Sequence, residues 1–372
     1  MKKIKTGLIG IGKVGHTHAK ILKKLPESIF SGVYHKKYER AREFAYKFGV
    51  TAYTDIEEMV QIGGIQAIMI ATPHPAHAKP AISAMNAGAH VMVEKPLASS
   101  LEDCDAMIKI AKQTKKKLAV ISQRRFYEPV RRIKKAIDSG KLDTPILGTV
   151  NMFGWRDKAY YDSDPWRGTW IKEGGGVLIN QAPHQIDILQ WCMGPVDELY
   201  GCWANLNHPY IEVDDTSVAL LKFSNGALGN IIVSNSQNPA LYGRVAIYGR
   251  NGSAVGVQTD GGAMFIAGMS QITEPPINYL WTIPGEENLL KKWQKEDADF
   301  FLKIDATQYY HELEIKDFLT AIVENRAPLV TGIEGRKTVE IIVAIYRSQR
   351  DKKVVKFPLS LDDNENFDGR LV

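Results

Sequence analysis

The sequence predicts an α/β protein with a doubly wound parallel sheet in its amino-terminal part and an α+β domain with a large open, mainly antiparallel sheet after it. Short apolar runs alternate with helical patterns over the first 120 or so residues. From about residue 145, long alternating stretches follow, joined by Ser-Asn-Gly and Arg-Asn-Gly turns. The length of 372 residues exceeds one ordinary core and fits two domains.

The amino-terminal half has the order strand, helix, strand throughout. Apolar runs of strand length alternate with amphipathic runs of helix length. The expected strands are 3–12, 30–35, 65–73, 90–96 and 118–123, and the expected helices are 16–25, 38–49, 77–89 and 101–117. Strands that are apolar on both faces, with helices between them, belong to a parallel sheet covered on both sides. We therefore expect a dinucleotide-binding domain over residues 1–124.

The carboxyl-terminal half is expected to form a substrate-binding and oligomerisation domain over residues 125–372. Alternating apolar and polar residues predict antiparallel strands within 146–156, 198–208, 215–235 and 242–258, with helices near 180–194 and 309–326. Residues 260–305 have loop composition and no clear period, so no element is assigned there. The polar tail, about 360–372, is either a loose arm or a contact with a neighbouring subunit.

The composition argues against several classes of protein. The formal net charge is only +5, and the lysine runs are not interleaved with aromatic residues, so we expect no nucleic-acid partner. The three cysteines lack Cys-x-x-Cys spacing, so neither a metal site nor a disulfide framework is expected. No segment is long and apolar enough for a membrane span, and we expect a cytoplasmic protein.

The stretch "GLIGIGKVG" carries Gly10, Gly12 and Gly15 in Gly-x-Gly-x-x-Gly spacing between a strand and a helix. The first glycine permits a tight turn, the second lets a pyrophosphate approach the backbone, and the third lets the helix pack on the strand. This pattern predicts a Rossmann dinucleotide site, in which Ile11, Lys13 and Val14 complete the loop. The histidines that follow, His16 and His18, are either surface or core residues of the helix.

The end of the second strand bears on the choice of cofactor. A carboxylate usually stands there and binds the ribose hydroxyls of NAD. This sequence has His35, Lys36 and Lys37 instead, and cations suit the 2′-phosphate of NADP. The residues therefore favour NADP, although the lysines can equally be solvated and an NAD enzyme can hold the ribose through backbone groups.

Four motifs together resemble one known family. "GLIGIGKVG", "ATPHPAH", "EKPLA" and "GGGVLINQAPHQIDILQW" follow one another in the order and spacing of the Gfo/Idh/MocA family of sugar and inositol oxidoreductases. The resemblance covers nearly the whole chain, including residues 314–348. It implies NAD(P)-dependent oxidation of a CH–OH group. It also implies that the nicotinamide cofactor contacts the loops containing Ala71, Thr72, Pro73, His77, Glu94 and Lys95.

The same resemblance implies the reacting groups. Lys95 matches the lysine that faces the nicotinamide and the reacting hydroxyl. Hydride loss from a secondary alcohol requires a proton acceptor, and His184 is the candidate. A neighbouring ammonium such as that of Lys95 stabilises the developing alkoxide. Many relatives carry aspartate four residues before the histidine. Here Asn180 offers a carbonyl but no charge, which makes His184 a weaker base unless Asp187 compensates.

Arginines and aromatic residues supply the expected substrate pocket, because a polyol needs apolar surfaces and fixed donors. Arg125 and Trp155 align with family positions in the pocket. Asp187 aligns with a position that contacts substrate hydroxyls, but it can also be a surface carboxylate. Further candidates, of which some are structural, are Arg156, Tyr160, Tyr161, Trp166 and Arg167.

Two other functions stay open at this point. One is a hydrolase or lyase with a tightly held cofactor that oxidises its substrate transiently, and the other is a non-catalytic sugar sensor on the same scaffold. The presence of both Lys95 and His184 argues against the sensor, since a binding module needs neither. The open sheet face predicts a homodimer or homotetramer.

Overall fold

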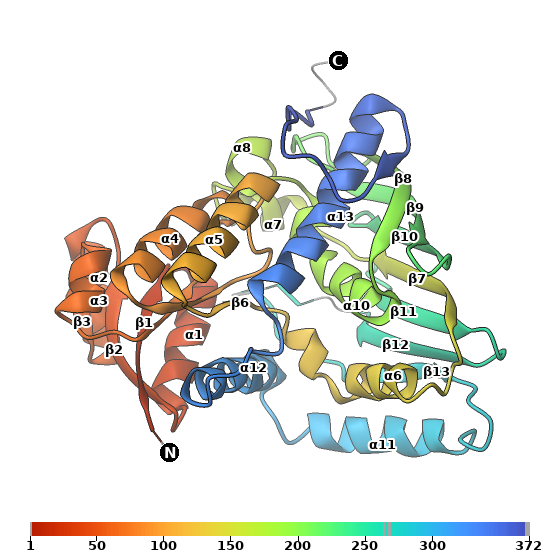
Figure 1. Ribbon diagram of the computed structural model, residues 1–372, viewed down its shortest axis with the longest axis horizontal. Helices are drawn as coiled ribbons and strands as arrows, with labels where there is room; N and C mark the ends of the chain where they lie inside the picture. The colour runs from red at the N-terminus through yellow and green to blue at the C-terminus, as the bar shows by residue number, and fades with distance from the viewer. Residues whose placement is uncertain (1, 263–264, 267–268, 369–372) are drawn as a thin grey trace. The chain divides into compact units, whose positions relative to one another are not determined.

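The protein was analysed as a computed structural model, which describes residues 2–262, 265–266 and 269–368. The chain forms two compact units. The first comprises Met1–Gln123 and Thr307–Arg336, and the second comprises Arg124–Ala306 and Lys337–Val372. A segment from late in the sequence therefore belongs with the amino-terminal part, as the colours in Figure 1 show.

The first unit contains a parallel sheet of six strands in the order β3-β2-β1-β4-β5-β6, which is the strand order of a Rossmann fold. The strands are β1 Ile4–Ile9, β2 Ser28–Tyr34, β3 Thr51–Tyr53, β4 Ala67–Ile70, β5 His90–Val93 and β6 Leu118–Val120. The predicted doubly wound sheet is confirmed. No element was expected from the sequence at β3, which has three residues, or at the following helix α3 Ile56–Gln61, because both are too short for a clear period.

Helices cover both faces of this sheet (Figure 1). They are α1 Lys13–Lys24, α2 Tyr38–Phe48, α3, α4 Ala78–Ala87, α5 Leu101–Thr114 and α12 Ala306–Val323, with a short 3-10 helix η1 at His74–Ala76. Leu22 of α1, Phe44 of α2 and Phe318 of α12 share one core with Leu8 and Met69 of the sheet. Residues 307–336 thus complete the core of the first unit rather than forming a separate element.

The second unit contains an eight-stranded sheet in the order β13-β12-β11-β7-β10-β9-β8-β14. Its strands are β7 Pro145–Phe153, β8 Val196–Ala204, β9 Thr216–Phe223, β10 Leu228–Ser234, β11 Tyr242–Gly249, β12 Ala254–Asp260, β13 Ile277–Trp281 and β14 Val355–Lys356. Among the described strands of this second sheet, only β7 and β10 pair in parallel, so the predicted mainly antiparallel sheet is confirmed.

One face of this sheet is covered by helices and the other is open. A Cβ at Gly148 would lie 2.7 Å from Leu189 of α10 Pro183–Met193, and one at Gly201 would lie 3.0 Å from Ile345 of α13 Gly332–Asp351. On the opposite face, apolar side chains such as Leu220 remain exposed. The remaining elements are η2 Gln123–Phe126, α6 Glu128–Asp138, α7 Lys158–Asp162, α8 Trp170–Glu173, α9 Val177–Asn180 and α11 Leu289–Phe301.

Residues 260–305, to which the sequence analysis assigned no element, contain β13 and α11. Helix α11 is held by a buried ion pair, with 2.6 Å between Arg132 Nη1 and Asp297 Oδ2. Trp281 and Trp293 pack edge to face with 4.8 Å between their ring centroids. The strand has only five residues and the helix is largely exposed, so neither has a strong apolar period.

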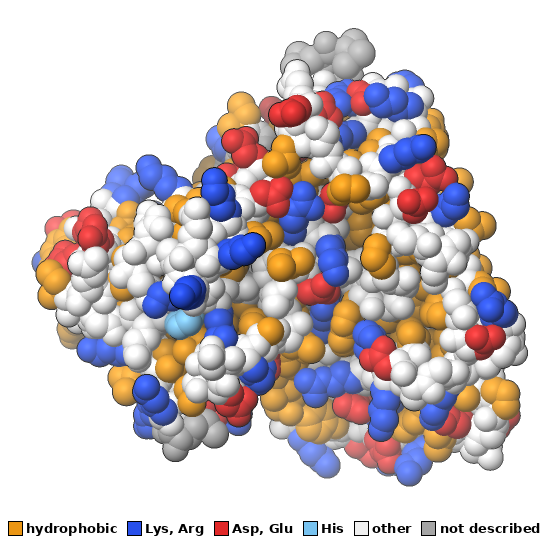
Figure 2. Space-filling model, in the orientation of Figure 1, with side chains coloured by type: hydrophobic (Ala, Val, Ile, Leu, Met, Phe, Trp, Pro, Cys, Tyr) orange, Lys and Arg blue, Asp and Glu red, His pale blue; other side chains and the backbone are white. Residues whose placement is uncertain are grey.

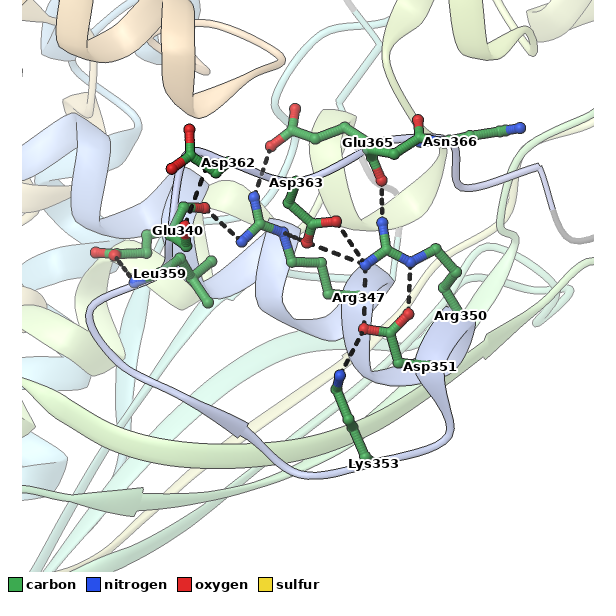
Figure 3. A network of polar contacts seen from close by, with 12 residues as sticks. Glu340, Arg347, Arg350, Asp351, Lys353, Leu359, Asp362, Asp363, Glu365 and Asn366 are labelled. Atoms are coloured by element: carbon green, nitrogen blue, oxygen red, sulfur yellow. Dashed lines mark hydrogen bonds and ion pairs between the residues drawn. The ribbon is translucent and has the colours of Figure 1, made fainter.

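The described part of the polar tail, residues 360–368, lies against the unit-2 portion of α13 (Figure 3). Arg347 and Arg350 both bind the carboxylate of Asp363, with nitrogen–oxygen distances of 2.9 Å, and Arg347 also binds Glu365. These ion pairs fix this part of the tail to its own chain. Residues 369–372 of the predicted tail lie outside the described residues.

Within the described ranges, no helix combines the length and the hydrophobicity that crossing a membrane requires. On the face shown in Figure 2, basic and acidic side chains are interspersed over both units.

Candidate active site

The loop after β1 can be built only with glycine at two positions. Gly10 has a φ of +101°, and a Cβ there would lie 2.4 Å from the carbonyl carbon of Ala71. A Cβ on Gly15 would lie 2.1 Å from the carbonyl oxygen of Gly10. The first glycine therefore lets β1 and β4 approach at the point where the strand order reverses, and the third lets α1 pack on the turn.

Gly12 differs from the other two glycines, because a Cβ there would meet no atom within 4 Å. It is the N-cap residue of α1, and no described side chain caps this helix end. The space beside Gly12, at the N-terminus of α1, fits a pyrophosphate, which a helix N-terminus attracts. The loop from Gly10 to Gly15, with Ile11 within it, thus fits the dinucleotide predicted from the sequence.

The end of β2 is cationic, as the sequence indicates. Tyr34 is the last residue of the strand, and His35, Lys36 and Lys37 follow it. The backbone N–H of Lys37 donates to Nδ1 of His35 over 3.0 Å, which closes a tight turn, and Lys36 is exposed.

The loops after β4 and β5 are joined by a buried histidine. His77 Nε2 lies 2.8 Å from the carbonyl oxygen of Thr72, and Nδ1 lies 3.0 Å from that of Pro96. Burial lowers the pKa of His77, so the ring is neutral and donates to one of these carbonyls at a time. His77 therefore lies behind the loop of Ala71, Thr72 and Pro73 and fixes it, rather than lining its surface.

A buried carboxylate precedes Lys95 at the end of β5. Glu94 Oε1 lies 2.7 Å from Nε2 of His18, and Glu94 Oε2 accepts the backbone N–H of Lys95 over 3.1 Å. Burial alone would raise the pKa of Glu94. The hydrogen bond and charge of His18, together with the nearby His311 and Lys95, lower this pKa to about 2. Glu94 is therefore a permanent anion beside the lysine.

Two further histidines, His18 and His311, lie at this site and were not expected there from the sequence. His18 comes from the buried side of α1 and His311 from α12, with 5.8 Å between their ring centroids. Burial lowers the pKa of His311 to about 4, against the attraction of Glu94, so this imidazole is neutral. A polar residue in the buried stripe of α1 was the available signal for His18, since a buried polar side chain needs a partner.

In the second unit, the structure joins Arg125 to Asp187, two residues that were predicted to contact substrate. Nε and Nη2 of Arg125 donate to Oδ2 and Oδ1 of Asp187 over 2.8 Å and 2.6 Å. Both side chains are buried, and the guanidinium lies 4.7 Å from the ring centroid of Trp191. The carboxylate of Asp187 therefore neutralises Arg125, a partner that the sequence analysis did not anticipate.

Asn180 ends α9, and His184 is the second residue of α10 and 7% exposed. The Nδ2 group of Asn180 donates to Oε1 of Glu173 and, over 3.1 Å, to the hydroxyl of Tyr160. Glu173 is 1% exposed, and burial raises its pKa to about 7, against hydrogen bonds from Gly168 and Asn180. A buried acid that the sequence analysis did not assign thus lies directly behind Asn180.

The other pocket candidates have mixed roles. Trp155 forms an isolated bridge with Ser236 and lies 5.8 Å, between ring centroids, from His208. Tyr160 and Arg167 are joined by a hydrogen bond, and the Arg167 guanidinium lies 4.5 Å from the ring centroid of Trp166. These contacts tie the aromatic residues to one another, in addition to any contact with a ligand.

Comparisons with known proteins match both parts of the chain. Residues 4–122 match the model described as "Oxidoreductase family, NAD-binding Rossmann fold", and residues 130–255 match the GFO/IDH/MocA C-terminal domain. The chain is 27% identical to a myo-inositol 2-dehydrogenase of Thermotoga maritima over 361 residues, 95% of this chain and 98% of that protein. It is 25% identical to a scyllo-inositol 2-dehydrogenase (NAD(+)) of Bacillus subtilis over 99% of each chain.

A solved structure is similar along its whole length. The WlbA dehydrogenase from Bordetella pertussis, in complex with NADH and UDP-GlcNAcA, is 28% identical and has a TM-score of 0.80. The likeness covers 96% of this chain and 100% of that one. With its glycine loop, its Rossmann sheet and its matching second domain, this chain belongs to the GFO/IDH/MocA family of NAD-binding oxidoreductases.

Proposed function

We propose that this protein transfers a hydride between NAD(P) and a secondary alcohol or ketone of a sugar, a glycoside or an inositol. The observation that carries the proposal is the full-length similarity to two inositol dehydrogenases, in a chain that has both Lys95 and His184. The similarity to a dehydrogenase in complex with UDP-GlcNAcA supports sugar derivatives as the wider substrate class.

The residues divide the chemistry between them. The bound nicotinamide supplies the hydride acceptor, and the glycine loop would hold its pyrophosphate. His184 takes the proton of the hydroxyl, and the ammonium of Lys95 stabilises the oxygen as its negative charge develops. The anion of Glu94 lies beside Lys95, and the charge of Lys95 contributes to the low pKa of Glu94. Asn180, Arg125, Trp155 and Asp187 are the residues of the second unit that we propose for contacts with the substrate.

For the cofactor, we propose a preference for NADP over NAD. The three residues after β2 carry no carboxylate that would repel a 2′-phosphate, and Lys36 is an exposed cation, which suits one. NADP should bind more tightly than NAD, and Lys36→Ala should narrow the difference. Equal affinities in the native protein, measured by titration calorimetry, would remove this preference.

We propose that the open face of the large sheet joins copies of the chain into a homodimer or homotetramer. Val218, Leu220 and Leu228 are 45%, 63% and 58% exposed, and they come from neighbouring strands. Exposed apolar patches of this kind mark interaction surfaces. Leu220→Glu should lower the mass measured by sedimentation equilibrium, and an unchanged mass would contradict this assembly.

The decisive test is a panel of polyols, sugars and glycosides followed at the nicotinamide absorbance. With the best substrate, Lys95→Ala and His184→Ala should each lower kcat by roughly a hundredfold or more, the size of a general acid/base contribution, with cofactor affinity nearly unchanged. Lys79→Ala, which removes an exposed lysine of the same unit, is the control. Turnover within a few-fold of native for either variant would exclude that residue from the reaction.

A further inference from the structure

We propose that Glu173 is a positioning residue for Asn180. It fixes the side-chain amide so that Asn180 addresses the reaction through its carbonyl oxygen, as a hydrogen-bond acceptor. This inference rests on the proposed function, since it assigns a role within the same site. It concerns a residue that no motif in the sequence marks, one position before the glycine run 174–176.

The first step is the contact between the two side chains. Glu173 ends α8 and is almost completely buried. Its Oε2 accepts the backbone N–H of Gly168, and its Oε1 accepts Nδ2 of Asn180. When it is ionised, above about pH 7, this carboxylate can only accept hydrogen bonds, so it selects the NH₂ side of the amide.

The second step is the other hydrogen of that NH₂ group. It points to the hydroxyl oxygen of Tyr160, which lies 3.1 Å from Nδ2. The same oxygen also accepts from Arg167 and, over 2.9 Å, from Gln181. The phenol oxygen of Tyr160 therefore has several hydrogen-bond donors around it. If the amide of Asn180 were flipped, its oxygen would lie against the carboxylate of Glu173. The carboxylate of Glu173 therefore specifies one orientation of the amide, and the hydroxyl of Tyr160 accommodates it.

The third step is the chemical consequence. With both hydrogens of Nδ2 directed at Glu173 and Tyr160, the side chain of Asn180 presents Oδ1 to any further partner. That partner must be a donor, such as a substrate hydroxyl or a ring N–H of His184. Asn180 thus supplies the acceptor that an aspartate supplies in many relatives, while the negative charge lies one side chain farther back, on Glu173, once this carboxyl is ionised above about pH 7.

The energetic cost of Glu173 supports a role beyond packing. Burial raises the pKa of this carboxyl to about 7, even with hydrogen bonds from Gly168 and Asn180 and the charge of Arg167 opposing the shift. Asp214 adds to the increase. A neutral glutamine would accept the Gly168 N–H without this penalty. Ionisable groups held at such a cost are characteristic of functional sites.

The test exchanges the two side chains. Glu173→Gln leaves two amides face to face with no fixed orientation, and Asn180→Asp places two carboxyls together. Each single variant should lower kcat by about tenfold or more, in the range of a misplaced reacting group, with little change in the KM for cofactor. Asn180→Asp should also move the acidic limb of the pH profile upward.

The double variant Glu173→Gln with Asn180→Asp again pairs a donor with an acceptor, and puts the charge at position 180. It should recover most of the lost turnover. Asp297→Asn is the matched control, because it removes another buried carboxylate of the unit, whose partner is Arg132. It should lower stability with kcat unchanged.

A double variant no faster than the product of the two single effects would overturn the proposal. So would native kcat in Glu173→Gln. Failure of the proposed function would be seen separately, as absence of turnover in the native enzyme across the whole panel, and the proposal would fall with it.

Discussion

Glu94 in the first unit and Glu173 in the second are both buried glutamates beside a proposed reacting residue, yet their pKa values shift in opposite directions. The pKa of Glu94 is lowered to about 2 and that of Glu173 is raised to about 7. Burial opposes ionisation at both sites. The difference comes from the partners, which are the imidazole of His18 and the ammonium of Lys95 at one site, and an amide and a backbone N–H at the other.

The comparison separates two uses of a buried acid. A carboxylate with cationic partners stabilises the fold at neutral pH, because folding makes its ionisation easier. A carboxylate with neutral partners costs stability at neutral pH, because folding makes its ionisation harder. A buried carboxylate with neutral partners is therefore explained only by a function that needs its negative charge or its capacity to accept hydrogen bonds.

The largest expected effect is a loss of stability when Glu94 is replaced, and its absence would contradict the comparison. Its depressed pKa contributes stability above about pH 4.5, and this contribution is lost as the pH falls toward 2. Glu94→Gln should therefore lower the free energy of unfolding by on the order of 3 kcal/mol at pH 7, at 1.36 kcal/mol per pKa unit. Urea unfolding at pH 7 and at pH 3 would measure this, and the gap should shrink at the lower pH.

Glu312→Gln is the control for that measurement. Its ion pair with Lys24 is at the surface, where the lysine side chain is 68% exposed, so the change should cost less than about 1 kcal/mol. A Glu94→Gln variant as stable as native at pH 7 would mean that His18 and Lys95 do not offset the burial of the carboxylate.

The two sites also differ in how far the sequence could predict them. The glycine spacing is local: one strand, one turn and one helix carry it, so the positions of Gly10, Gly12 and Gly15 could be interpreted directly, and only the approach of Gly10 to Ala71 required the sheet order. The buried pair of His18 and Glu94 is not local, because 76 positions separate the two residues and only the sheet order brings them together.

A second effect, of intermediate size, tests the separate roles of Gly10 and Gly12 in the glycine loop. Gly10→Ala should destabilise the first unit by about 2 kcal/mol or more, because the new Cβ meets the backbone of Ala71 in a conformation with positive φ. Gly12→Ala should leave stability nearly unchanged, since its Cβ meets open space, but should weaken cofactor binding. Thermal unfolding with and without cofactor separates the two outcomes, and equal loss of stability in both variants would contradict the assignment.

In the second unit the sequence predicted the sheet but not the network behind the site. Asn180 was singled out as a departure from the family, and its expected partner was His184. Its hydrogen bonds to Glu173 and Tyr160 depend on a bend through three glycines and on α7, which no period in the sequence specifies. Likewise, Arg125 and Asp187 could each be chosen as pocket residues, but their pairing required the tertiary structure.

The smallest expected effect is a change in stability when Glu173 is replaced, and its sign distinguishes the two kinds of buried carboxylate. The pKa of Glu173 is higher in the folded protein than the ordinary value of 4.5, so the carboxyl costs no stability below about pH 4.5. The cost appears as the pH rises from there to about 7 and is complete above 7.

Glu173→Gln removes this cost, less a penalty for the amide that it places against Asn180. The variant should therefore be more stable than native by about 1–2 kcal/mol at pH 8, and the gain should diminish toward pH 5. Urea unfolding at both pH values measures the gain, and a simultaneous fall in kcat would mean that stability is given up at this position for the orientation of Asn180. A variant less stable than native at pH 8 would instead place Glu173 with Glu94, as a carboxylate that stabilises the fold, and the contrast between the two units would be lost.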